Sequence, residues 1–111
     1  MPRPLNTRKI NFQPGVTFFK PAGVPMAELK EVILAFEEVE ALRLKDVDGF
    51  GQTEAAEKMG VSQPTFFRVL ASARKKIATA IVTGKAIRVE GGSFSFEQGV
   101  QRNGRRYQGG K

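Results

Sequence analysis

Hydrophobic and polar positions between residues 52 and 82 follow a helical period that is interrupted once. In the segment QTEAAEKMG, the inward positions are Ala55, Ala56 and Met59, with Gln52 or Thr53 as the cap. After the interruption, an apolar stripe recurs at three- and four-residue intervals, and it consists of Phe66, Val69, Leu70, Ala73 and Ile77. The pattern predicts a short helix followed by a longer one over residues 63–82, which stops at Gly84.

The remaining elements are shorter. Residues 36–47 predict a helix that ends at Asp48-Gly49, with its inner face on Phe36, Val39, Leu42 and Val47. On its other side, we interpret the acids Glu37, Glu38 and Glu40 as a solvated face rather than a carboxylate cluster. The EVIL segment before this helix is a short strand or a helical turn, and KAIRVE after the last helix predicts a strand. Near the N-terminus, KINF and VTFFK flank the turn signal QPG, which is consistent with a hairpin.

The break between the two long patterns has the features of a helix-turn-helix over residues 52–70. Ala56 is small where the second helix must approach closely, and Gly60 supplies a residue that tolerates positive φ in the turn. Val61 closes the small core after the turn. Ser62 is placed to cap the second helix, and Pro64 falls in its first turn, where a missing N–H costs nothing. The sequence therefore predicts a mainly α fold with a helix-turn-helix three-helix core, and short strands from the N-terminal arm and after the last helix.

The outward face of the second helix carries the candidate chemistry. Gln63, Phe67 and Arg68 stand near its start, where side chains that read bases in the major groove are found, because amide, guanidinium and apolar groups each match a base edge there. Arg74, Lys75 and Lys76 follow and suit phosphate contacts. Gln52, Thr53, Ser62 and Thr65 complete the set of predicted DNA-binding residues. Two alternatives stay open: Phe67 packs on the N-terminal arm or a second subunit, and late basic residues serve the helix dipole.

Composition narrows the possible functions. The 111 residues suit one domain, which we place at residues 1–92, followed by a basic Gly/Arg-rich tail at 93–111 that we expect to be disordered. The chain has no Cys and no His, so thiolate and imidazole metal sites and the commonest general base are excluded. We expect no enzyme activity, no cofactor, no membrane segment and a cytoplasmic location.

The net charge of +7 is segregated along the chain. Residues 28–57 carry nine Asp/Glu against three Lys/Arg, whereas residues 58–89 carry seven Lys/Arg and no acid. Such separation favours docking of one positive face on a polyanion.

Five separated motifs within residues 2–92 support a family resemblance: PRP, FFKPAGVP, EALRLKD, AAEKMGVSQPTFFRVLASARKKIA and GKAIRVEGG. Together they resemble the small proteins grouped as domain of unknown function 134, or uncharacterised protein family 0251. The central part is similar to the C-terminal DNA-binding region of sigma factors. The resemblance implies a helix-turn-helix fold and a predicted DNA-binding role, and the family has no assigned enzyme activity. The chain departs from the family pattern at Ala35-Phe36, where a polar cap is usual, and at Gln63, where Arg is common.

These observations favour a sequence-specific double-stranded DNA-binding protein that regulates transcription as a homodimer on a two-fold site. One alternative is an interaction module that binds a protein such as RNA polymerase through the acidic helix around Glu37–Glu40. Another is RNA binding through the basic arm and tail.

Overall fold

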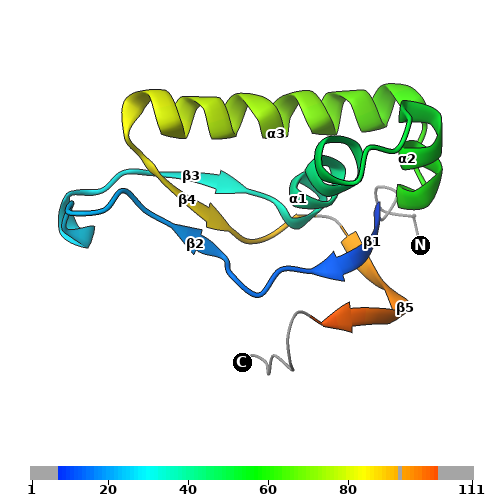
Figure 1. Ribbon diagram of the computed structural model, residues 1–111, viewed down its shortest axis with the longest axis horizontal. Helices are drawn as coiled ribbons and strands as arrows, with labels where there is room; N and C mark the ends of the chain where they lie inside the picture. The colour runs from blue at the N-terminus through cyan, green and yellow to red at the C-terminus, as the bar shows by residue number, and fades with distance from the viewer. Residues whose placement is uncertain (1–7, 93, 103–111) are drawn as a thin grey trace, which may run out of the picture.

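The computed structural model describes residues 8–92 and 94–102 (Figure 1). Its helices form one side of the molecule: α3 runs along that side, with α1 and α2 against its N-terminal half and strands below its C-terminal half. The helical elements are the 3₁₀ turn η1 (Met26–Glu28), α1 (Phe36–Leu42), the π-helical turn η2 (Arg43–Val47), α2 (Gln52–Met59) and α3 (Gln63–Thr83). The predicted class, mainly α with short strands before and after the helices, is confirmed.

The strands form two small sheets, and neither contains the hairpin that the sequence suggested. In the first sheet, β1 (Arg8–Gln13) lies parallel to β5 (Phe94–Arg102). In the second, β4 (Ala86–Val89) is central, between antiparallel β2 (Phe18–Phe19) and parallel β3 (Glu31–Leu34). The hairpin prediction is wrong because each N-terminal strand pairs with a strand that follows α3 rather than with its neighbour in the chain.

The prediction of a disordered tail does not hold for its first part. Phe94–Arg102 forms β5, whose backbone is paired with β1, and composition takes no account of such a partner. The remainder of the predicted tail, residues 103–111, lies outside the described residues.

The main hydrophobic core lies where α1, η2, α2 and α3 meet. Leu44, Met59 and Phe66 are fully buried there, together with small residues that let the helices approach. A second cluster, around Leu34, Ala73 and Val89, joins α3 to the second sheet. The two clusters thus hold successive stretches of the inner face of α3.

The inner face of the α1 region differs from the predicted one after Leu42. Val47 is 76% exposed, and Leu44 is buried instead. The cause is the π turn, in which the N–H of Asp48 donates to the carbonyl of Arg43, 2.7 Å away. This wider turn rotates the following residues away from the register of an α-helix.

Candidate nucleic-acid interface

The turn between α2 and α3 has the geometry that its sequence predicted. Gly60 ends α2 in the left-handed region, with φ of 69°, and its N–H donates to the Glu57 carbonyl at 3.0 Å. The N–H of Val61 donates to the Ala56 carbonyl at 3.0 Å, so the chain closes tightly before α3 begins. Only glycine adopts this φ without strain, which explains its place in the turn.

Ser62 caps α3, as predicted. Its Oγ accepts a hydrogen bond from the N–H of Thr65 at 3.2 Å and donates one to Thr65 Oγ1 at 3.0 Å. Pro64 lies in the first turn, where its fixed φ suits the helix. At the other helix the cap prediction is wrong: Gly51 rather than Gln52 or Thr53 is the N-cap of α2, and its carbonyl accepts from the N–H of Ala55 at 2.8 Å.

One of the two adjacent phenylalanines faces the core and the other faces the outside. Phe66 is completely buried, whereas 53% of Phe67 is exposed. Gln63 and Arg68 are exposed beside Phe67, and the Arg68 Nη2 donates to Thr65 Oγ1 at 3.3 Å. The first two turns of α3 therefore present an amide, an aromatic ring and a guanidinium to the outside.

The three predicted phosphate-binding residues have unequal surroundings. Arg74 donates to both carboxylate oxygens of Asp46 through its Nε and Nη2, and these hydrogen bonds lower the pKa of Asp46. Lys76 Nζ lies 2.9 Å from the carboxylate of Glu38. Within the described ranges, no ion pair joins Lys75 to an acid, and Lys75 is exposed. The charge available on this face of α3 is therefore concentrated on Arg68 and Lys75.

Glu38 is 6% exposed and forms part of a buried network, so the prediction of a solvated acidic face is wrong for this residue. Its carboxylate accepts from the backbone N–H of Ala35 at 2.8 Å, from the Ser72 hydroxyl at 2.5 Å and from Lys76. The bond to Ala35 satisfies the start of α1, which has no side chain that could cap it. Glu38 therefore joins α1 to the middle of α3.

Glu40 is also buried, at 1% exposed, and the same prediction is wrong here. Its carboxylate accepts from the backbone N–H of Asn11 at 2.8 Å and from Arg43 Nε and Nη2 at 3.1 and 2.8 Å. The hydrogen bonds between Arg43 and Glu40 raise the pKa of Arg43, which also contacts Asp48. The network fixes β1 against α1.

A polar hollow of about 340 Å³ lies beside the outward face of α3. Arg8 from β1 and Arg68 from α3 both line it, together with Glu37 and Thr65. The first turns of α3 and the N-terminal strand thus belong to one continuous surface.

The predicted residues of α2, the turn and the first turns of α3 do not all lie together. Ser62, Gln63, Thr65, Phe67 and Arg68 gather at the start of α3, whereas Gln52 and Thr53 lie at the opposite end of α2. A residue that the sequence reasoning did not select, Lys9, packs along the turn: an added Cβ on Gly60 would lie 3.4 Å from its side chain. Only its basic charge in an arm rich in Arg and Lys could have indicated it.

Residues 8–92 and 94–102 contain no group of three or more Cys, Asp or Glu side chains placed to hold a metal ion. Nor do they contain a helix long and apolar enough to cross a membrane.

The described residues thus define a small, mainly α protein in which two consecutive helices meet at a glycine turn and short strands support the longer one. The family model described as "Protein of unknown function DUF134" matches residues 1–97, and the chain belongs to that family.

Relatives extend the match. The chain is 62% identical over 94 residues to a UPF0251 protein of Moorella thermoacetica, an alignment that covers 85% of this chain and 63% of the relative. It is 56% identical over 105 residues to a UPF0251 protein of Thermoanaerobacter sp., covering 95% of this chain and 93% of the relative. The chain thus spans less than two thirds of the Moorella relative but nearly all of the Thermoanaerobacter one. No solved structure matches the chain.

Proposed function

We propose that this protein binds double-stranded DNA sequence-specifically and regulates transcription, with the first turns of α3 in the major groove. One observation carries the proposal: α3 contains no acid, and its exposed start presents Gln63, Phe67 and Arg68 together. These groups match an adenine edge, a thymine methyl and a guanine edge in turn. They stand on a capped helix anchored by the buried Phe66, so the backbone that carries them is in place before binding.

Helix stability alone does not explain the charge on this face. Arg68 lies in the first third of α3, far from the C-terminal turn where a cation would favour the helix dipole. The expected phosphate contacts come from Lys75 and Lys9, which flank the base-reading end along the helix and at the turn. Arg74 and Lys76 contribute less, since Asp46 and Glu38 already neutralise them.

The alternative function, binding of a protein partner through the acidic helix around Glu37–Glu40, loses support. Glu38 and Glu40, two of the three acids that it would use, are buried and hydrogen-bonded within the chain. A protein partner could not reach them without disrupting α1. We therefore retain DNA as the partner, with a homodimer on half-sites one helical turn, roughly 34 Å, apart.

Selection of bound duplexes from a random pool tests the proposal. A short enriched motif, repeated with two-fold symmetry, is the expected result. Arg68→Ala should then change the preferred base at one position of each half-site, whereas Lys30→Ala, at the far end of the molecule near β4, should leave both motif and affinity unchanged. Failure to enrich any duplex, with correctly folded protein, would overturn the proposal.

A further inference from the structure

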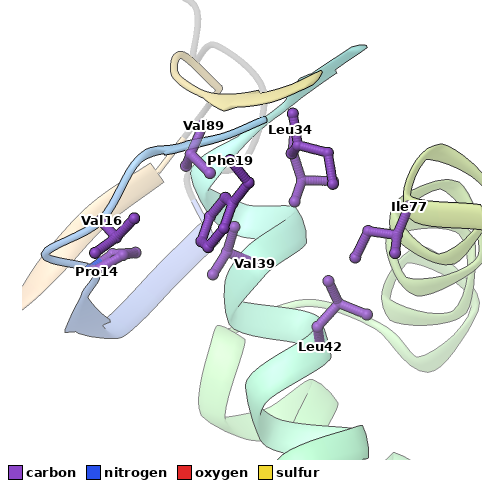
Figure 2. Close-up of a pocket in the computed structure, with 9 residues that line it drawn as sticks. Pro14, Val16, Phe19, Leu34, Val39, Leu42, Ile77 and Val89 are labelled. Carbon is purple, nitrogen blue, oxygen red and sulfur yellow. The ribbon is translucent and has the colours of Figure 1, made fainter. Parts of the chain in front are cut away.

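An apolar hollow of about 300 Å³ lies between the helices and the second sheet (Figure 2). Val39 and Leu42 of α1 and Ile77 of α3 point into it from the helices, and Leu34 and Val89 from the strands. Figure 2 shows Pro14 and Val16, on the segment that connects β1 and β2, and Phe19 of β2 along the remaining side. All nine lining side chains are hydrocarbon, so water inside would lack hydrogen-bonding partners.

A second hollow of about 300 Å³ adjoins the first, because Phe19 and Ile87 line both. These two residues are direct partners across β2 and β4, so their side chains lie on the same face of the sheet. On the helix side, Ile77 lines the first hollow, and Ala80, Ile81 and Gly84 line the second. The spacing of these four positions keeps them on one face of α3. The two hollows are therefore neighbours along the C-terminal half of α3, and we refer to the pair as the trough.

The trough has a dry end and a basic end. Lys20 and Lys85 line only the second hollow. In the described part of the chain neither lysine forms an ion pair with an acid, and Lys20 Nζ donates to the neighbouring Pro21 carbonyl at 3.0 Å. Each ammonium has three donors, so both retain capacity for an anion.

We propose that this trough binds an amphiphilic anion, namely an unbranched hydrocarbon chain with a terminal carboxylate. The hydrocarbon occupies the dry hollow, and the carboxylate lies between Lys20 and Lys85. The two hollows together reach the size of small-molecule sites, which is roughly 300–1,000 Å³. Val16 and Phe19, 57% and 51% exposed, stand at the open side and are covered once the chain is bound.

The positive charge of Lys20 and Lys85 argues against two other occupants of the trough: a second copy of the chain and the residues that follow β5. A second copy docked trough to trough would supply no acid for Lys20 and Lys85, because the residues that line its trough include lysines and no carboxylate. The residues that follow β5 are polar, and their only charges are the basic residues Arg105, Arg106 and Lys111. An anionic amphiphile complements both the dry end and the basic end of the trough, whereas neither of these occupants supplies an anion for the basic end.

Calorimetric titration of the full chain with decanoate, below its micelle concentration, tests the proposal without DNA. We expect saturable one-to-one binding of decanoate, binding of decan-1-ol weaker by roughly tenfold, and no binding of acetate, because two exposed ion pairs supply only the smaller share of affinity. The double variant Lys20→Gln/Lys85→Gln should bring decanoate to the level of decan-1-ol and leave decan-1-ol unchanged. Lys58→Gln, a lysine over the Phe50 ring far from the trough, is the matched control.

Two variants fill the hollow. Val39→Phe should abolish binding of both ligands, and Val16→Trp at the exposed rim serves if the first variant fails to fold, as judged by circular dichroism. Absence of saturable decanoate binding would overturn the proposal, as would binding that both filled variants retain. A dimer in sedimentation that the filled variants dissociate, with no decanoate binding, would assign the trough to a second copy instead. DNA binding is unaffected by these outcomes, so the two proposals fail separately.

Discussion

Lys76 of α3 reaches α1, where its ammonium lies 2.9 Å from the buried carboxylate of Glu38. The same carboxylate accepts from the Ser72 hydroxyl and from the backbone of Ala35. A single acid thus caps one helix and fixes it to another. A buried carboxylate is tolerated only with such partners, so these hydrogen bonds are what allows Glu38 to lie inside the protein.

Replacing Glu38 should therefore be costly. Glu38→Gln removes the charge that Lys76 and the α1 start both use, and we expect a loss of about 1–3 kcal/mol in the free energy of unfolding. Urea denaturation at neutral pH measures it. Glu57→Gln, an exposed acid of α2, should stay within about 0.5 kcal/mol of the parent. Equal stability of the two variants would show that the network contributes little.

The sequence predicted the α2–turn–α3 unit well because its determinants are local. The apolar spacing placed Phe66 inside and Phe67 outside, and Ser62 was identified as a cap from its position before Pro64. Each of these features depends on residues within about one or two turns of one another.

The features that the sequence did not reveal depend on distant partners. Glu40 is buried because it meets Asn11 of β1, and Phe18 pairs with Arg88 across the sheet. The π turn that follows α1 turns Val47 away from the core, which periodicity alone cannot detect. β5 has apolar residues at alternating positions, Phe94 and Phe96, but the Gly- and Arg-rich composition of the tail obscured that signal.

The Ser62 cap should make a measurable contribution to stability. Ser62→Ala removes the acceptor for the Thr65 N–H, and we expect a loss of about 1 kcal/mol. Ser62→Asp restores an acceptor and should recover that stability, while its negative charge weakens DNA binding. Chemical denaturation and duplex-binding titrations of both variants check the two effects. If Ser62→Asp bound DNA as tightly as the parent, the start of α3 would not be near phosphates.

Acid should weaken the Asp46–Arg74 pair. Hydrogen bonding to Arg74 lowers the pKa of Asp46 below its ordinary value of 3.8. A carboxyl whose pKa is lower when folded contributes stability above its unfolded pKa, and this is lost as the pH falls through the folded pKa. Carbon-detected NMR titration should place the midpoint of Asp46 below 3.8 in the parent and nearer 3.8 in Arg74→Gln. An identical midpoint in both proteins would contradict the pairing in solution.

Substitution of Phe67 should test DNA binding without disturbing the fold. Because half of this ring is exposed, Phe67→Ser should change the free energy of unfolding by no more than about 0.5 kcal/mol. Phe66→Ser, at the neighbouring buried position, should destabilise by several-fold more. If Phe67 meets a thymine methyl, its replacement weakens binding to the selected duplex and relaxes one base position. A change in sedimentation, with base preference intact, would instead place Phe67 at a subunit contact.

The salt dependence of DNA binding should distinguish the proposed phosphate contacts from one another. Each phosphate neutralised by a cation adds about 0.9 to the slope of log affinity against log salt. Lys75→Ala should lower that slope by nearly one such step and weaken all duplexes alike, because Lys75 has no acid partner among the described residues. Arg74→Ala should change the slope less, since Asp46 already neutralises Arg74. Duplex titrations from 50 to 200 mM salt distinguish them, and a larger effect of Arg74 would mean that its ion pair opens on DNA.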